Sequence, residues 1–400
     1  MEPRQDELER QDFAWMVLAS LVFFILVAIA AWRAFDTEYG PLQGRFRQIL
    51  EQHNQLAAAR RFRPGIRQIW NPEIGVVDRC ITCHLGYEWG GQLPTDLPQP
   101  FAPHPPLPYL DKHPFPQFGC TVCHGGQGWA TTASMAHVGG EHWQSPMLSD
   151  KLARRLGLTA AQLIQMRCNI CHRHDLSTPG MEEINQAKDL VKRKKCLLCH
   201  AIEGKGGLVG PELTYFGDKN PELFDFKNVT GAHTVFNWSY QHLMNPDQIT
   251  PNTTMPTFGF EQAQARALTL LLLSWKRNNF PPQYIPTPVE IAQPPYKLAS
   301  AVGEPPMVAG AESGRNIFRT RGCAFCHTVG QGRLLGPDLK GVGARRDERW
   351  MRQWLADPAS VIRAYPEFAH WPDEYDGIVM PNQNLSAEEI NALVAYLSKL

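Results

Sequence analysis

One pentapeptide recurs along this sequence and uses every cysteine that the chain contains. All ten cysteines fall in the pattern Cys-x-x-Cys-His, so none is left over for a separate disulfide or metal site. The five copies are Cys80/Cys83/His84, Cys120/Cys123/His124, Cys168/Cys171/His172, Cys196/Cys199/His200 and Cys323/Cys326/His327. Because the spacing never varies, we expect the same chemistry at all five positions.

This pentapeptide is typical of covalent haem attachment. Two thioether bonds hold the edge of the porphyrin, and the adjacent histidine reaches the iron as the proximal ligand. Zinc ribbons and redox-active cysteine pairs also use Cys-x-x-Cys, but neither requires a histidine after every second cysteine. We therefore expect five covalently bound haem c groups, with the cysteines as attachment points and the five histidines as iron ligands.

An apolar segment near the N-terminus is long enough to cross a bilayer. From Phe13 to Trp32 only Ser20 interrupts a run of apolar residues. A cleaved signal peptide is the alternative, but its apolar region is shorter and ends in a small-residue cleavage site. We expect a retained single-pass anchor in the cytoplasmic membrane. The arginines on its two sides slightly favour the opposite orientation, but haem attachment implies that everything after Trp32 is exported to the periplasmic side.

Charge and length limit the remaining classes. Lys and Arg together number 39, as do Asp and Glu, so no nucleic-acid surface or polybasic patch is indicated. With 400 residues, 43% of them hydrophobic, the chain is long enough for two or three domains.

The second half of the chain contains an internal repeat around the fourth and fifth pentapeptides. A Gly-Pro turn follows each one, and an aromatic helix ended by proline and a Met-Pro pair come later. Each copy closes with an amphipathic helical pattern. The matching features are Gly210-Pro211 and Gly336-Pro337, Trp238/Leu243/Pro246 and Trp350/Leu355/Pro358, Met255-Pro256 and Met380-Pro381, and the helical patterns at 261–275 and 386–400.

These repeated features resemble class I cytochrome c domains over about 182–280 and 307–400. In the C-terminal copy, Gly314 and Phe318 precede the cysteines and Tyr396 lies on the final helix, as in the helix crossing of that family. The resemblance implies Met255 and Met380 as distal iron ligands at the fourth and fifth haems. Without it, each methionine would be read as a flexible core filler.

The first three haems need distal ligands from a proline-rich region with little periodic pattern. The candidates are His104, His113, His137 and His142, in that order of preference. His104 and His113 each precede a proline, which restricts the direction of the imidazole. His174 ranks lower because it lies only two residues after His172. For any single one of these histidines, the alternative is a solvent-facing loop residue.

The passage from Gly119 to Gly128, followed by Ala130 and Thr131, resembles multihaem subunits of bacterial quinol-oxidising complexes of the bc type or of alternative complex III. The resemblance implies a subunit that passes electrons from a membrane quinol-oxidising complex to a soluble cytochrome or a terminal oxidase. We expect no enzyme, because candidate histidine and methionine ligands outnumber the distal positions and no catalytic motif stands out. Histidine pairs lower the iron potential relative to histidine–methionine pairs, so haems one to three would be the entry and haems four and five the exit. A multihaem reductase or oxidase with one open haem is the alternative.

We therefore expect a mainly α fold with much irregular loop. The expected parts are a transmembrane anchor at 1–35, a loop-rich three-haem module at 36–181, cytochrome c domains at 182–280 and 307–400, and a Pro-rich linker at 281–306. The linker either lets the last domain swing or packs along the surface.

Overall fold

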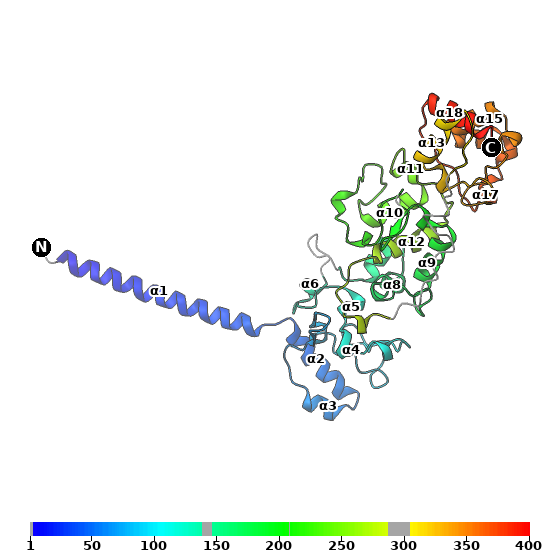
Figure 1. The fold of residues 1–400 in the computed structure, drawn as a ribbon. Helices are drawn as coiled ribbons and strands as arrows, with labels where there is room; N and C mark the ends of the chain where they lie inside the picture. The colour runs from blue at the N-terminus through cyan, green and yellow to red at the C-terminus, as the bar shows by residue number, and fades with distance from the viewer. Residues whose placement is uncertain (1–2, 138–145, 208, 287–304) are drawn as a thin grey trace. The chain divides into compact units, whose positions relative to one another are not determined.

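The computed structural model describes residues 3–137, 146–207, 209–286 and 305–400, and it is mainly helical (Figure 1). Two compact units divide the chain, 1–147 and 148–400. Helix α8 (Ala160–Cys171), which carries the two cysteines of the third pentapeptide, therefore belongs to the second unit together with the fourth and fifth pentapeptides. The sequence instead predicts the third pentapeptide in one three-haem module, 36–181, together with the first two.

The first unit begins with the long helix α1 (Pro3–Phe35). Within its segment Arg10–Arg33, the most apolar 18-residue window has a mean hydropathy of 2.7, and none of that window is buried against the protein. Its length and composition suffice to cross a membrane. A small core formed by α2 (Tyr39–Gln52) and α3 (Leu56–Arg61) follows, with Phe46 and Leu50 buried at its centre.

The rest of the first unit is a succession of short elements joined by loops. They are the antiparallel strands β1 (Ile69–Asn71) and β2 (Val76–Asp78), the 3-10 turns η1 (Cys80–Thr82) and η2 (Leu110–Lys112), and the short helices α4 (Phe115–Phe118), α5 (Thr121–His124) and α6 (Ala133–Ala136). Two of these elements, η1 and α5, carry the first two pentapeptides.

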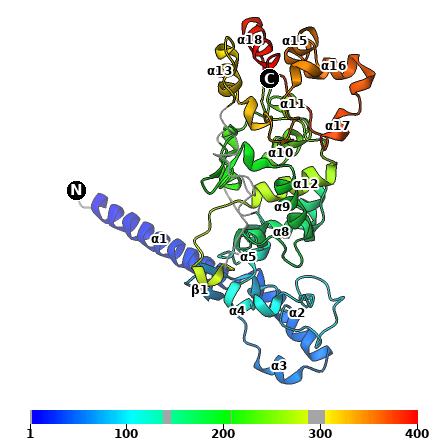
Figure 2. The same ribbon diagram turned by 45° about the vertical axis from the view of Figure 1, so that its right-hand side comes forward.

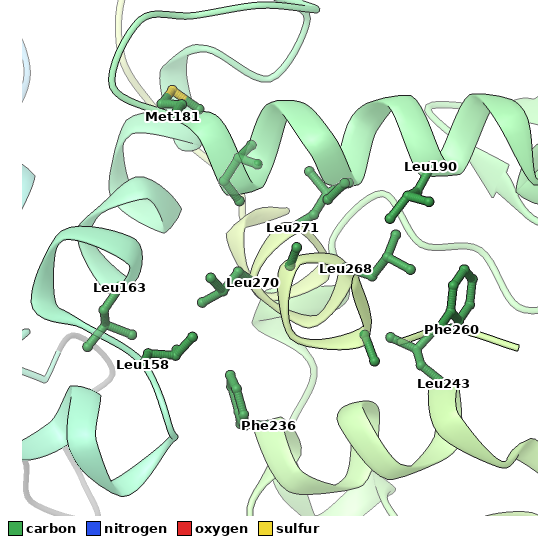
Figure 3. Close-up of a cluster of buried hydrophobic side chains, with 14 of the residues drawn as sticks. Leu158, Leu163, Met181, Leu190, Phe236, Leu243, Phe260, Leu268, Leu270 and Leu271 are labelled. Atoms are coloured by element: carbon green, nitrogen blue, oxygen red, sulfur yellow. The ribbon is translucent and has the colours of Figure 1, made fainter. Parts of the chain in front are cut away.

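Helix α12 (Gln262–Ser274) is the centre of the larger core in the second unit. It packs against α8 (Ala160–Cys171), α9 (Glu182–Arg193) and α10 (Val235–Met244), as Figure 3 shows. Its apolar run 270–273 is a core helix segment, as its short length predicts. Around this core lie α7 (Asp150–Arg155), η3 (Cys196–Leu198), strands β3 (Ala201–Ile202) and β4 (Lys205–Gly206), η4 (Phe216–Asp218), η5 (Pro221–Leu223), α11 (Pro246–Ile249) and η6 (Pro282–Tyr284).

The last domain is built on a crossing of its first and last helices. Helices α13 (Glu312–Thr320) and α18 (Ala387–Leu397) lie side by side in Figures 1 and 2. Phe318 and Tyr396 are buried at this crossing, with ring centres 5.8 Å apart. The other elements are η7 (Cys323–Phe325), α14 (Val342–Arg345), α15 (Glu348–Ala356), α16 (Pro358–Ala364), η8 (Pro366–Phe368) and α17 (Trp371–Glu374).

The helices expected from the repeat are confirmed. Helix α12 occupies the first closing pattern, and α18 occupies the second but ends at Leu397 rather than Leu400. Helices α10 and α15 carry Trp238 and Trp350, and in each copy a proline starts the next helix. The Pro-rich linker lies mostly outside the described residues.

Replacing Gly314 tests the helix crossing. A Cβ at this position would lie 2.0 Å from the backbone oxygen of Ala392, so Gly314→Ala forces the helices apart. We expect a loss of unfolding free energy of at least about 1–3 kcal/mol. Gly44→Ala on α2, where an added Cβ has no neighbour within 4 Å, is the matched control and should be neutral or slightly stabilising. Equal denaturation midpoints for Gly314→Ala and the unsubstituted protein would contradict the close crossing of α13 and α18 at Gly314.

Candidate haem-attachment sites

The five pentapeptides fold into closely similar tight turns. In each, the backbone N–H of the histidine donates to the carbonyl oxygen of the first cysteine. The distances are 2.9 Å for His84 and His124 and 3.0 Å for His172, His200 and His327. This bond places both cysteines and the histidine around one short helical turn, and none of the ten cysteines forms a disulfide. The arrangement is the one that two thioether links and one iron ligand on the same group require.

The proximal histidines of the last two turns are held by their Nδ1 atoms. His200 Nδ1 lies 2.8 Å from the carbonyl oxygen of Pro211, and His327 Nδ1 lies 3.0 Å from that of Pro337. A carbonyl oxygen can only accept, so Nδ1 carries the proton and Nε2 carries the lone pair. Burial lowers the pKa of both imidazoles, which keeps them in the neutral form that binds a metal.

The Gly-Pro turn after each of these pentapeptides has a steric reason. A Cβ at Gly210 would lie 2.5 Å from Cε1 of His200, and a Cβ at Gly336 would lie 2.5 Å from Cε1 of His327. Only glycine lets the backbone come this close to the imidazole. The following proline carbonyl then reaches Nδ1, so the turn is the support of the proximal histidine.

A buried carboxylate joins the first two turns. Asp78, fully buried at the end of β2, accepts hydrogen bonds from the backbone N–H groups of Cys80 at 3.1 Å and of Cys120 and Thr121 at 2.7 Å. A hydrogen bond with the Cys120 thiol is the largest cause of the raised pKa of the Cys80 thiol. The first cysteines of these two pentapeptides are therefore neighbours.

The structure places Cys123 differently from the second cysteines of the first, fourth and fifth turns. Those cysteines each follow a 3-10 turn, whereas Cys123 lies within the short helix α5, whose first N–H groups Asp78 caps. The backbone N–H of Cys123 still donates to the carbonyl oxygen of Cys120, at 3.2 Å. The thiol that forms a hydrogen bond with Cys80 belongs to Cys120. Cys171 of the third turn likewise lies within a helix, α8, so the local structure of the second and third turns differs from that of the other three. The role of all ten cysteines as attachment points, Cys123 included, stays a prediction.

Two of the four candidate distal histidines face proximal histidines. The ring centres of His104 and His124 are 6.2 Å apart, and those of His137 and His84 are 6.0 Å apart. His104 Nδ1 is 2.9 Å from the carbonyl oxygen of Pro105. Burial, and then the facing imidazole, lowers the pKa of His84 and His124.

A third candidate, His113, follows the 3-10 turn η2. His113 Nδ1 lies 2.8 Å from the carbonyl oxygen of Tyr109, and its ring packs on Phe118. Its role as a distal ligand stays a prediction. His142 lies outside the described residues.

A polar cavity of about 350 Å³ adjoins the third turn. Cys171 and His174 line it together with the cationic side chains of Arg173, Lys276 and Arg277. His172, the proximal histidine of this turn, has its Nδ1 2.6 Å from Asp175 Oδ2. One carboxylate, Glu203, also lines the cavity and lies 3.1 Å from Arg173. The remaining excess of cationic side chains suits a group that carries carboxylates, as a haem does with its propionates.

The two methionines named by the sequence lie against the two cores. Met255 packs on the core around α12, and Met380 packs on the core of the last domain. The Sδ atom of Met380 accepts a hydrogen bond of 3.1 Å from Nε1 of Trp354. In the repeat alignment His242 takes the place of Trp354, and each ring stacks on the tryptophan four residues before it.

One buried donor in the last domain fits a bound haem. Nε1 of Trp350 is buried and finds no acceptor among the residues that the structure describes. A buried N–H of this kind normally has a partner, and a haem propionate is a suitable one. The residues present therefore fit the group that the pentapeptide implies.

Sequence reasoning missed Asp78, Trp354 and His242 as contributors to these sites. Asp78 had no usable signal, because its partners are backbone N–H groups more than forty residues away as well as nearby. The sequence does contain a signal for Trp354 and His242, because both lie four residues after a tryptophan that the repeat aligns.

The cytochrome c family model matches residues 184–276 and 311–400. A curated relative, cytochrome c oxidase subunit 2 from Alkalihalophilus pseudofirmus, is 31% identical over 111 residues, which are 25% of this chain and 29% of the relative. This chain thus spans less than a third of that relative's length. The solved cytochrome c domain of the pp3183 protein from Pseudomonas putida is 39% identical, covers 21% of this chain and 83% of that chain, and has a TM-score of 0.19.

The two matched segments coincide with the repeat and contain the fourth and fifth turns. Residues 184–276 and 311–400 are therefore similar to cytochrome c domains, a family whose members carry covalently bound haem and take part in electron transfer.

Replacing Trp354 tests its contact with Met380. Its N–H withdraws electron density from the sulfur, which disfavours ferric iron on that ligand and raises the potential. Trp354→Phe should lower the potential of the fifth site by up to about 20–60 mV, because a neutral hydrogen bond contributes about 0.5–1.5 kcal/mol and tenfold is about 59 mV for one electron. A spectroscopic redox titration measures this shift. Trp371→Phe is the control, because the ring of Trp371 meets that of Trp354 edge-on with ring centres 5.2 Å apart, and an equal shift in both variants would assign the effect to packing.

Proposed function

We propose that this chain is a membrane-anchored pentahaem c-type cytochrome. It would transfer electrons from a membrane quinol-oxidising complex to a periplasmic soluble cytochrome or a terminal oxidase. The observation that carries the proposal is the histidine-to-cysteine backbone hydrogen bond that all five pentapeptides share. Each bound haem supplies a one-electron ferric/ferrous couple, and the protein supplies its ligands and surroundings.

The anchor in this proposal is α1. Its 24-residue apolar segment is exposed along its most apolar window, which suits a lipid environment and not a protein core. All five attachment turns follow this helix in the chain, so a single span puts them on one side of the cytoplasmic membrane. The proposed orientation makes this the periplasmic side, because haem attachment to cysteine pairs implies export.

We assign His137 as the distal ligand at the first site and His104 at the second. Two imidazoles bound to one metal, each with a metal–nitrogen bond of about 2 Å, have ring centres roughly 6 Å apart. The separations of 6.0 Å for His84/His137 and 6.2 Å for His104/His124 agree with this value. The Nδ1 contact of His104 turns its Nε2 toward coordination.

The proposed direction of electron flow follows from the ligands. A thioether in place of a second imidazole stabilises ferrous iron and raises the potential. The histidine-paired sites would receive electrons first, and the sites with Met255 and Met380 would deliver them. The similarity to a protein named cytochrome c oxidase subunit 2 supports a terminal oxidase among the possible acceptors.

The competing function is catalysis at a haem with an open distal position. Substitution of His104 and His137, which face proximal histidines, distinguishes electron transfer from catalysis at an open haem. His104→Ala and His137→Ala should each leave five haems attached but convert one low-spin site to one that binds carbon monoxide in the reduced state. The bound fraction should rise from near zero to about one haem in five, measured by optical titration.

His370→Ala, at an exposed position, is the matched control and should bind no carbon monoxide. Stoichiometric binding of carbon monoxide or nitrite by the unsubstituted reduced protein would instead support an open catalytic haem. No gain of binding in either histidine variant would remove the ligand assignment.

A further inference from the structure

A pair of backbone segments joins the two cytochrome c domains next to their proposed methionine ligands. Thr257, two residues after Met255, pairs in an antiparallel bridge with Val379, one residue before Met380. The N–H of Val379 donates to the carbonyl oxygen of Thr257 at 3.1 Å. Backbone pairing of this kind requires the two loops to keep one register.

Apolar packing accompanies this bridge. Ile378, from the last domain, packs against the core around α12 in the preceding domain. Gly259 and Gly377 face each other so closely that a Cβ on Gly377 would lie 2.9 Å from the carbonyl oxygen of Phe258 and 3.2 Å from the Cα of Gly259. The two backbones are therefore in direct contact.

Two lysines that precede the fourth pentapeptide add polar contacts. Lys194 Nζ donates to the carbonyl oxygens of Phe258 and Asp376, one from each domain. Lys195 Nζ donates to the carbonyl oxygen of Leu334 in the last domain at 3.0 Å. Burial lowers the pKa of both ammonium groups, as expected for side chains drawn into a contact.

The backbone of Lys195 is strained in a way that this contact explains. Lys195 has a left-handed conformation with φ of 52°, where the corresponding residue before the fifth pentapeptide is Gly322 with φ of 72°. A side chain in this conformation has a conformational cost that glycine avoids. Lysine at this position supplies a cation that reaches the other domain.

The fourth and fifth attachment turns also approach each other here. After burial, the neighbouring Cys199 thiol is the next largest cause of the pKa of about 12 at Cys326. The second cysteines of the two turns are thus within electrostatic range of each other.

We propose that these contacts form a fixed junction, defined by Lys194, Lys195, Thr257, Gly259 and 376–379, which locks the two cytochrome c domains together. This inference rests on the proposed function for its haems. The junction holds both methionine loops in place and lets one electron pass directly between the two sites. The donor iron goes from ferrous to ferric and the acceptor iron from ferric to ferrous, with no bond or proton exchanged. The last domain then has no need to swing on the linker.

Hydrogen exchange at the Val379 amide tests the junction in the full-length protein, once its mass shows that the haems are attached. Gly377→Ala should speed exchange of this amide by about 5- to 100-fold through overpacking. It should also weaken the near-infrared band of thioether-ligated ferric haem. Gly332→Ala, with a similar φ of 83° and no neighbour within 4 Å of its added Cβ, is the control for backbone strain and should change neither quantity.

A milder pair of variants covers the case in which Gly377→Ala fails to fold. Lys194→Met should also speed exchange at Val379, and Lys192→Met, two residues earlier and exposed, should not. A freely exchanging Val379 amide in the unsubstituted protein, or unchanged exchange in Gly377→Ala and Lys194→Met, would overturn the junction while leaving the haem count intact. Faster exchange with an unaltered near-infrared band would overturn the claim that the junction supports the methionines.

Discussion

The backbone hydrogen bond from each pentapeptide histidine to the first cysteine is the constraint on which the sites depend. It closes a turn in which two sulfur atoms and one imidazole can bind the same group. The rest of the local structure serves that turn: carbonyl oxygens of Pro211 and Pro337 fix the imidazole tautomer, and glycines make room for the rings. In the first unit the carboxylate of Asp78 supports two turns, because it accepts hydrogen bonds from backbone N–H groups of both.

The two units reach stability by different means. The cytochrome c domains bury helices around α12 and at the crossing of α13 and α18, so each has an apolar core beside its turn. The first unit has short elements and a small core around Phe46, and its turns are tied by polar contacts to Asp78. Because a bound haem is a large apolar body, it adds most to stability where the protein core is smallest.

The sequence predicts those parts of the structure that repeat or that depend on local spacing. The five turns, the helices around Trp238 and Trp350, and the crossing at Gly314 all follow from residue patterns. The last helix ends before its pattern does, because a tighter i to i−3 bond from Lys399 to Tyr396 replaces the helical one.

Contacts between distant segments could not be predicted in this way. The hydrogen bonds from Cys120 and Thr121 to Asp78 join residues more than forty positions apart in the sequence. The pairing of His104 with His124 could not be predicted either, since loops of this length do not fix which residues meet. The bridge between Thr257 and Val379 uses only backbone atoms, so the residue types at these positions do not predict it.

Intact mass analysis of the mature polypeptide, followed by peptide mapping, tests the central claim most directly. The account predicts five haem masses, with thioether links at all ten cysteines, Cys123 included. Fewer than five haems would contradict it. A disulfide would also contradict it, above all one between the neighbouring thiols of Cys80 and Cys120.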